Sequence, residues 1–429
     1  MLQSPLPVCV VKLSMSERFD EIARYLVLAM GIAIPLNTPA VSITSGLMLL
    51  FWMLAAHDAK NLREKVQIIL TNPVAVVALV LWGVIGLGML HGSQSWHDAL
   101  EMWWRYRKLL IIAVIITLLQ DYRWRRWAEY AFVGTMLFTL VQRYGYALDW
   151  WWSGGVGPYA PRNAMGHITH NILMAFTAYW VLQRMWQYEP VLTRWQYRAY
   201  GLVVLFAVSD VLFLTPGRTG WVVLAALSIF ALYQRWKWRG VFAALLFLGT
   251  ISVFAFQFSK AFHSRVTDTV SEVNKYSTGD PTETSFGQRV QFYKHSLEIM
   301  ITYPLLGGGT GSFRGEYNRR VSAQETHTEN PHNEYFALGT QIGFLGLGVF
   351  LYMLVQQWRL AATLPGRKDR VAQGVLLTIV TGSLLNSLLF DFHDGHFYAY
   401  FIGLLYASLG QQEDRAPATQ PDKSCSDTL

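Results

Sequence analysis

Charged residues are scarce in this sequence of 429 residues: they make up 15%, against about 25% in soluble globular domains. Apolar residues account for 52%, and the mean hydropathy is +0.25. This balance argues against an ordinary soluble domain and indicates that lipid surrounds much of the chain. Lipid requires every backbone polar group to find an internal partner, which leaves helices or closed barrels. Because the apolar runs are too long and continuous for barrel strands, we expect an all-α, polytopic membrane protein.

Cysteine and the familiar catalytic signatures are also in short supply. The two cysteines, Cys9 and Cys425, lie near opposite ends of the sequence, so neither a disulfide framework nor a metal cluster is expected. There is no Asp-x-Asp pair of the kind that holds a metal in nucleotide-sugar transferases, no Gly-x-Ser-x-Gly elbow and no His-Glu-x-x-His. The first apolar run flows into a second one, which favours a retained span over a cleaved signal peptide.

Apolar runs approaching the roughly 20 residues that a bilayer requires recur along the chain. We predict about twelve spans, with spans one to nine in residues 1–257 and spans ten to twelve in 333–410. Residues 258–332 between them form one large polar loop that contains helices, and residues 411–429 are expected to be a disordered tail. The predicted spans are 25–37, 40–56, 73–91, 107–120, 127–141, 166–183, 199–214, 219–234, 240–257, 333–356, 371–390 and 396–410.

The distribution of Lys and Arg sets the orientation of these spans. Cations concentrate in alternate loops, and the five cationic loops begin at Lys60, Arg123, Arg184, Arg235 and Arg359. We therefore place that side and both termini in the cytoplasm, and the large loop on the outer side. Since the net charge of +7 is spread through these loops, it reflects topology and predicts no nucleic-acid partner.

One cationic stretch lies on the outer side and departs from this rule. Arg105, Arg107 and Lys108 follow an aromatic cluster at the outer end of the fourth span. Aromatic and basic residues together are typical of a helix that lies in the membrane interface. The cluster consists of Trp96, Trp103, Trp104 and Tyr106.

His332 stands directly before the apolar run of the tenth span. Asn330 as the N-cap and Pro331 at the first helical position would place His332 in the first turn of that span. The positive end of the helix would then keep the imidazole neutral, able to accept a proton and close to any bound anion. The alternative is an interfacial histidine that only anchors the helix.

Two arginines on the outer side are the further candidates. Arg218 begins the eighth span, at a membrane boundary where an ionisable group is costly and therefore a functional candidate; the alternative is a side chain that snorkels to the headgroups. Arg289 follows Ser285 and Gln288, which fit a capping box and predict a loop helix. The alternative for Arg289 is an exposed, solvated side chain. The apolar face of the loop helix consists of Val290, Tyr293, Leu297 and Ile301.

Two other segments attract attention without a definite role. The glycine-rich run 304–313 lacks the Gly-Lys-Ser/Thr ending of a phosphate loop, so we predict a tight re-entrant turn. The last outer loop gathers four polar side chains that could bind a metal or form an interfacial polar turn. These are Asp391, His393, Asp394 and His396, and like His327 they carry no firm assignment.

Two arginines and a neutral histidine on one side of a membrane suit a particular reaction. Guanidinium forks match phosphate oxygens, and a neutral imidazole is a natural general base. Together they favour attack by a hydroxyl with departure of a phosphate. At this point the sequence resembles the O-antigen ligase and polymerase superfamily of bacterial membrane glycosyltransferases. The specific resemblance consists of Arg218–Trp221, the Arg289 helix, Tyr303–Phe313, Pro331–Tyr335 and Gly343–Leu347.

The resemblance implies a GT-C-like fold and transfer of glycan from undecaprenyl diphosphate at the periplasmic face of the bacterial inner membrane. In the ligase branch, which we favour, the acceptor is a sugar hydroxyl of the lipid A–core. By motif, His332 would be the base, and Arg218 and Arg289 would bind the leaving diphosphate. Asp391 would support them, with Asp394 equally available. The family works without metal or nucleotide, so we expect no cofactor, and in-line attack would invert the anomeric centre.

Three other functions stay open. The motifs do not separate the ligase from an O-antigen polymerase, and a protein O-oligosaccharyltransferase would use the same chemistry. A transporter or flippase for lipid-linked glycan would instead need ionisable groups at mid-bilayer and inverted repeats. Mid-span charges are scarce here and no repeat is visible, which favours the enzyme.

Overall fold

The computed structural model describes residues 13–92, 94–150, 165–189, 191–215, 217–278, 284–322, 325–365 and 368–411. Within these ranges the regular secondary structure is helical, which confirms the all-α class. The predicted tail, beyond Gln411, lies outside the described residues. The helices are α1 (Met15–Ala33), α2 (Thr38–Ala55), α3 (Ala59–Thr71), α4 (Pro73–Leu87), α5 (Trp96–Arg105), α6 (Lys108–Leu118), α7 (Tyr122–Ala147), α8 (His167–Tyr188), α9 (Arg194–Ser209), α10 (Arg218–Phe258), α11 (Lys260–Thr278), α12 (Ser285–Thr302), α13 (Phe313–Asn318), α14 (Glu334–Ala361), α15 (Lys368–Gly382) and α16 (Phe392–Tyr406).

Each predicted span coincides with helix over most of its length. The eighth and ninth spans meet in α10, where Lys237 has a φ of 55° and interrupts the helix. Among the described residues, five helices are long and apolar enough to cross a membrane. They are Thr38–Ala55, Pro73–Leu90, Arg194–Leu214, Arg218–Phe258 and Glu334–Ala361. A polytopic membrane protein is consistent with this set, and the total of twelve crossings stays a prediction.

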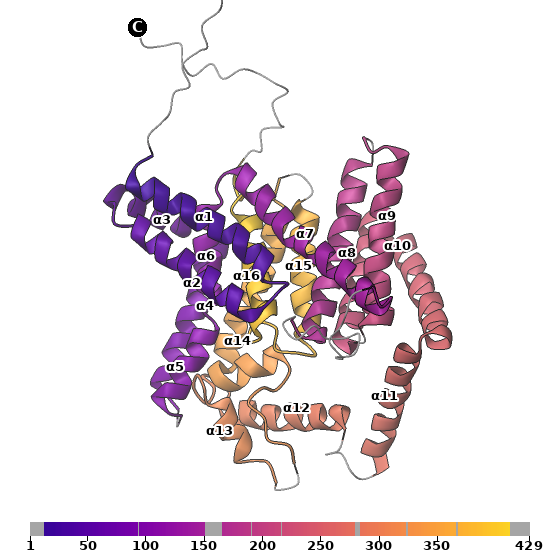
Figure 1. The fold of residues 1–429 in the computed structure, drawn as a ribbon. Coiled ribbons are helices and arrows are strands. Elements are labelled where there is room, and N and C mark those ends of the chain that lie inside the picture. Colours follow the sequence, from indigo (N-terminus) through magenta and orange to yellow (C-terminus); the bar gives the residue numbers. More distant parts are fainter. Residues whose placement is uncertain are drawn as a thin grey trace, which may run out of the picture.

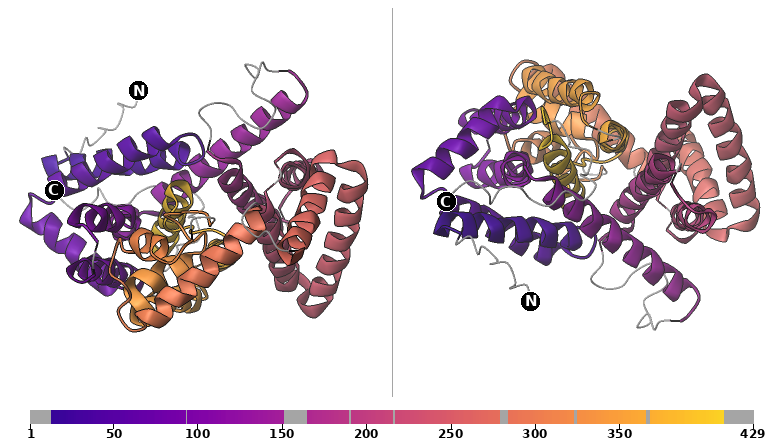
Figure 2. Two further views of the ribbon diagram at one scale, coloured as in Figure 1. Left: turned by 90° about the horizontal axis from the view of Figure 1, so that it is seen from below. Right: turned by 90° about the horizontal axis from the view of Figure 1, so that it is seen from above.

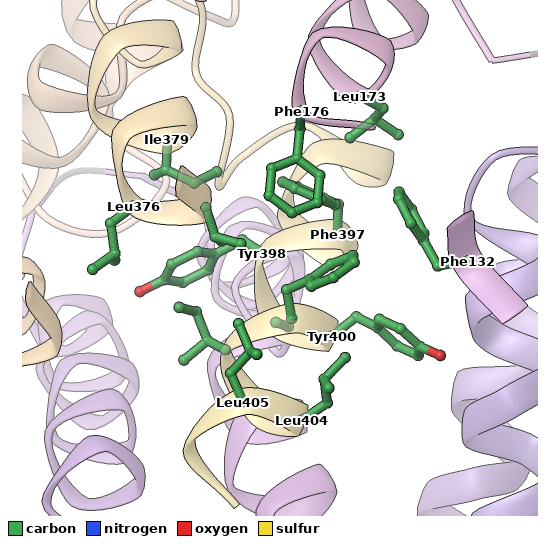
Figure 3. Packing of buried hydrophobic residues seen from close by; sticks show 14 of the residues in the cluster. Phe132, Leu173, Phe176, Leu376, Ile379, Phe397, Tyr398, Tyr400, Leu404 and Leu405 are labelled. Atoms are coloured by element: carbon green, nitrogen blue, oxygen red, sulfur yellow. The ribbon is translucent and has the colours of Figure 1, made fainter. Parts of the chain in front are cut away.

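The core is built around α16. Figure 3 shows Phe132 of α7 and Phe176 of α8 close to Phe397 of α16. The ring centroids of Phe176 and Phe397 are 4.9 Å apart, and all three side chains are fully buried. Edge-to-face aromatic contacts of this kind add to the stabilisation from burial. The last of the described helices is therefore the centre on which earlier helices pack.

The helices divide into two groups, and α12 reaches from one to the other. Figures 1 and 2 show α8 to α11 on one side and α1 to α6 with α14 to α16 on the other, while α7 runs from the second group toward α8. In Figure 1, α12 and α13 lie at the lower end, whereas the cationic helix α3 lies at the upper end. On the predicted apolar face of α12, Leu297 is 49% exposed and Ile301 is 68% exposed. This exposure suits a helix lying along a membrane surface.

The start of α12 differs by one residue from the prediction. Thr284 is the N-cap, because its hydroxyl accepts a hydrogen bond from the Gly287 N–H at 3.0 Å. The predicted cap, Ser285, directs its hydroxyl instead toward Glu272 of α11 at 3.2 Å. The Ser285 hydroxyl, which local sequence assigned to capping, is therefore used in a tertiary contact with Glu272.

The predicted turn in the glycine-rich run is confirmed, and it completes a break in α14. Gly343 has a φ of 65°, so the backbone ladder of α14 is interrupted there. The Gly308 N–H donates to the Thr340 carbonyl at 2.8 Å, and the Phe344 N–H donates to the Pro304 carbonyl at 2.7 Å. Irregular backbone inside a span is tolerated when other protein groups supply its hydrogen bonds. The segment 304–309 has this role.

The eleventh span is shorter than predicted. Helix α15 ends at Gly382, whereas the predicted span continued to residue 390. The Ser383 carbonyl accepts a hydrogen bond from the Glu334 N–H at 3.0 Å, which draws the chain toward the start of α14. Residues 383–391 therefore form a turn segment that lies against the beginning of α14.

Candidate active site

Arg218 is the first residue of α10, and it is positioned by a close approach to α8. A Cβ atom added at Gly217 would lie 2.7 Å from the Asn171 side chain, and one added at Gly220 would lie 2.4 Å from it. The Asn171 amide also donates to the Thr215 carbonyl. Gly217 and Gly220 are thus required by packing, and they fix where the Arg218 side chain begins.

The Arg218 guanidinium is held by a carboxylate that the sequence did not reveal. Its Nη1 and Nη2 donate to the two carboxylate oxygens of Glu272, both at 2.9 Å, and Nη1 also contacts the Ser285 hydroxyl at 3.2 Å. These hydrogen bonds hold the pKa of Glu272 below its ordinary value, against the effect of burial. A bidentate guanidinium–carboxylate pair has the geometry that Arg also uses for phosphate.

Arg289 lies on α12, half-buried and close to the Arg218 pair. Burial lowers the pKa of the Arg289 guanidinium; the nearby Tyr293 hydroxyl opposes this shift, and the positive charge of Arg218 adds to it. Within the part of the chain that the structure describes, no carboxylate forms an ion pair with Arg289. The structure therefore brings the two predicted arginines together, one paired and one available.

His332 does not lie where the sequence predicted. Helix α14 begins at Glu334, and its N-cap is Asn333, whose side chain accepts from the Phe336 N–H. The side chain of Asn330, the predicted cap, instead accepts from the His332 N–H at 2.9 Å. His332 thus precedes the helix, with a φ of 51° in the left-handed region that non-glycine residues seldom adopt. Strained conformations of this kind are concentrated at functional sites.

The His332 imidazole is flanked by three side chains. Its ring stacks on Phe292 with centroids 5.8 Å apart. Burial lowers the pKa of His332, Arg289 lowers it further, and a hydrogen bond with the Asn386 side chain opposes the shift. The neutral form is therefore favoured, as predicted, but the cause is burial and a neighbouring cation rather than a helix terminus.

Asn386 connects the histidine to the Arg218 turn. Its Nδ2 donates to the Thr219 hydroxyl at 2.8 Å, one residue beyond Arg218. The amide oxygen is then the atom left to accept a hydrogen bond from the imidazole of His332. Such a bond fixes one ring nitrogen as the donor and leaves the other as the base, as an orienting residue does in catalytic triads. No motif in the sequence pointed to Asn386, which lay within a predicted span.

Asp391 lies in a different environment. Lys108 is buried, and its ammonium donates to the backbone carbonyls of Leu389, Phe390 and Asp391 at 2.7, 3.0 and 2.7 Å. The cations that act on the Asp391 carboxylate are Lys108 and Arg105, and neither belongs to the His332 group. The structure thus brings together His332, Arg218 and Arg289, and it places Asp391 at the start of α16.

Glu334 is a second buried carboxylate that the sequence did not single out. It is fully buried and accepts hydrogen bonds from the Tyr106 hydroxyl and from the Leu389 and Phe390 N–H groups, at 2.9, 2.8 and 3.1 Å. Every one of these partners belongs to a segment packed against the start of α14. Glu334 therefore fixes the turn that carries Asn386.

The remaining polar residues of the last outer loop turn to separate partners. Asp394 accepts a hydrogen bond from Thr169 at 2.9 Å, and His393 lies 3.0 Å from the Thr38 hydroxyl. His396 is fully buried. Among the described residues, no group of three or more His, Cys, Asp or Glu side chains comes together as metal ligands would. These separate contacts fit the second of the two interpretations given above for this loop, a polar turn.

Comparison with known families adds an independent observation. The O-antigen ligase family model matches residues 201–351. That interval includes Arg218, Glu272, Arg289 and His332, and it ends before Asn386. No curated protein matches the chain.

Proposed function

Because the chain belongs to the O-antigen ligase superfamily through residues 201–351, we propose that it is a lipopolysaccharide O-antigen ligase. The donor would be a glycan on undecaprenyl diphosphate, and the acceptor a sugar hydroxyl of the lipid A–core. The observation that carries the proposal is the convergence of Arg218, Arg289 and His332 on α12. Arg218 contacts Ser285 at the start of this helix at 3.2 Å, Phe292 of the same helix stacks on His332, and Arg289 lies on the helix between these two contacts.

The chemistry divides between the two kinds of side chain. The acceptor hydroxyl attacks the anomeric carbon of the donor sugar while the bond from that carbon to the phosphate oxygen breaks. His332 takes the proton of the hydroxyl, and undecaprenyl diphosphate leaves with the bonding electron pair. Arg218 and Arg289 stabilise the negative charge that develops on the leaving oxygen, an effect strengthened by partial burial. In-line displacement would invert the anomeric centre.

Glu272 would have to yield when the donor arrives. In the free protein its carboxylate accepts hydrogen bonds from both terminal nitrogens of the Arg218 guanidinium. A diphosphate presents the same planar pair of oxygens with more negative charge, so it would replace the carboxylate at the Arg218 fork. Arg289, which has no ion pair among the described residues, would be the first contact for the incoming anion.

The orientation in the membrane is part of the proposal. The cationic helix α3 and the loop helix α12 lie at opposite ends of the molecule in Figure 1, which supports a cytoplasmic side with both termini and a periplasmic side with the site. Both substrates are anchored in lipid, so they would reach the site from the outer leaflet of the bacterial inner membrane. The large periplasmic loop would then be residues 258–332.

Transfer by the purified protein tests the proposal. The protein would be given undecaprenyl-diphosphate glycan and lipid A–core, with the product followed on a gel and its anomeric configuration determined by NMR. We expect glycan-capped lipid A–core and one undecaprenyl diphosphate released per transfer. Elongation of carrier-linked glycan without capping would overturn the ligase assignment in favour of a polymerase. In cells, loss of the protein should abolish capped lipopolysaccharide while long carrier-linked glycan accumulates.

A further inference from the structure

A second polar site lies at the other end of α12. An open cavity of about 360 Å³ is lined by residues of α5 and α13 and the chain beside them, together with Glu329 and Phe390. Its volume falls in the range of small-ligand sites. It is separate from the residues that surround Arg218 and Arg289, and no role has been given to it so far.

The lining of the cavity is arranged as ion pairs on facing walls. On α5, Arg105 pairs with Glu101 at 2.7 Å; on the α13 side, Arg314 pairs with Glu329 at 2.7 Å. The Arg105 guanidinium also lies over the Phe390 ring, 4.7 Å from its centroid. Paired guanidinium and carboxylate groups offer hydrogen-bond donors and acceptors side by side, with little net charge between them.

This combination indicates the chemistry of the ligand. Sugar hydroxyls both donate and accept hydrogen bonds, and the apolar face of a sugar ring packs on an aromatic ring such as that of Phe390. Asp98 adds a third carboxylate against two guanidinium groups in the lining, which leaves a small negative excess. A phosphate would therefore be disfavoured, and a neutral sugar fits best.

The cavity lining is connected to the chain on both sides of His332 in the sequence. Glu329 precedes His332 by three residues, and the Phe390 N–H donates to the Glu334 carboxylate at 3.1 Å, two residues beyond it. Figure 1 shows α13 and α11 near opposite ends of α12. The cavity and the Arg218–Glu272 pair therefore lie toward opposite ends of α12, the helix whose Phe292 stacks on His332. In-line attack needs the acceptor and the leaving diphosphate on opposite sides of the reacting carbon.

The position of the cavity beside α5 also suits a lipid-anchored acceptor. On α5, the side chains of Trp96 and Trp104 are 67% and 51% exposed. Exposed tryptophans of this kind anchor helices at the membrane surface. The other face of the same helix contributes Glu101 and Arg105 to the cavity, so a ligand bound there would lie beside the helix that we predict at the membrane interface.

We propose that this cavity binds neutral sugars of the acceptor oligosaccharide and thereby presents the accepting hydroxyl to His332. The proposal rests on the ligase function. It makes Phe390 and the Arg314–Glu329 pair determinants of acceptor binding, without contact to the donor diphosphate. The donor glycan, which is also a sugar chain, is the competing occupant.

Kinetics and direct binding test this assignment with Phe390→Ala and Arg314→Gln. We expect the KM for lipid A–core to rise about tenfold in each, with kcat and the donor KM nearly unchanged, as when binding common to the ground and transition states is lost. Arg319→Gln is the matched control, since Arg319 lies on the same short segment but pairs with Glu316 and is absent from the cavity lining. A rise confined to the donor KM would overturn the proposal, as would a fall in kcat alone.

Binding without turnover separates this proposal from the ligase function itself. Dephosphorylated core oligosaccharide, released from lipid A by mild acid, would be titrated against His332→Ala protein by saturation-transfer NMR. We expect binding to persist in that variant and to be lost in Phe390→Ala. Binding that survives Phe390→Ala and Arg314→Gln would overturn the cavity assignment. Failure of the wild-type protein to cap lipid A–core would instead reject the ligase function, whatever the titration shows.

Discussion

Two polar clusters flank the start of α14, and their hydrogen bonding differs sharply. Around Lys108 and Glu334, the buried charges are surrounded by fixed partners: three carbonyls accept from the ammonium, and three donors reach the carboxylate. Around His332 and Arg289, the charged or titratable groups act on one another: Arg289 lowers the pKa of His332, and Arg218 lowers that of Arg289. A satisfied cluster such as the first stabilises a fold, whereas neighbouring cations favour the arrival of an anion.

The comparison also explains why Asp391 was a weak candidate. Its backbone carbonyl belongs to the satisfied cluster, where it accepts from Lys108. Acidic residues in an outer loop look alike in sequence, whether they hold a turn or meet a substrate. The partners of each carboxylate distinguish them, and those partners lie far away along the chain.

Loss of the His332 imidazole should have the largest effect. We expect His332→Ala to reduce transfer by about 10²–10⁴-fold, the usual contribution of a general base. His332→Gly is the matched variant, because glycine adopts the positive φ of this position freely and alanine does not. Both should show this loss of transfer, while the glycine variant unfolds at the higher temperature. Transfer on gels and thermal unfolding measure the two effects, and normal transfer by either variant would exclude the base assignment.

Breaking the satisfied cluster should destabilise the protein instead. Glu334→Ala removes the acceptor for the Leu389 and Phe390 N–H groups, and each buried unsatisfied donor costs about 1–3 kcal/mol. We expect a loss of roughly 3 kcal/mol, seen as a lower unfolding temperature and a reduced yield in membranes. An unchanged unfolding temperature together with lost transfer would place Glu334 among the reacting groups. The cluster around Glu334 would then take part in catalysis rather than only stabilise the fold.

Neutralising the counter-ion of Arg218 should have a smaller effect of the opposite sign. We expect Glu272→Gln to bind undecaprenyl diphosphate about 3–10-fold more tightly, since a partly exposed pair is worth on the order of 1 kcal/mol. Glu298→Gln is the control, because Glu298 pairs with His295 on α12. Equilibrium binding to each protein in nanodiscs would decide. Weaker binding by Glu272→Gln would show that the carboxylate positions Arg218 instead of competing for it.

The pH dependence should show the coupling of Arg289 to His332. The base must be neutral, so activity falls as the pH drops through the pKa of His332, which lies below about 6.5, the ordinary value for imidazole. Arg289→Gln removes one cause of that lowering, so the acidic limb of kcat/KM should move to higher pH in the residual activity. Arg319→Gln serves as the control. A limb that stays in place, or moves to lower pH, would separate the two residues.

The helices and two arginines were accessible from sequence because their signals are local. Long apolar runs indicate helix wherever they occur, and a cation at a membrane boundary such as Arg218 stands out against apolar neighbours. The order of Arg218, Arg289 and His332 along the chain also carried the family resemblance.

The partners of these residues were not accessible, because they are contacts across the chain. Glu272 is 54 residues from Arg218, and Asn386 is 167 residues from Thr219. Even the cap of α14 depended on a distant residue: Ser387 donates to the Asn330 side chain at 2.6 Å, which leaves Asn333 to cap the helix. Local propensity offered two asparagines, and tertiary hydrogen bonds chose between them.

The break at Gly343 has a consequence for biogenesis. A membrane span normally enters the bilayer with its own hydrogen bonds complete, but α14 relies on backbone groups of residues 304–309. These residues are synthesised first, so in the orientation proposed above the glycine segment would reach the periplasmic side before the first half of α14 emerges. Insertion of this helix would then be coupled to export of the preceding loop.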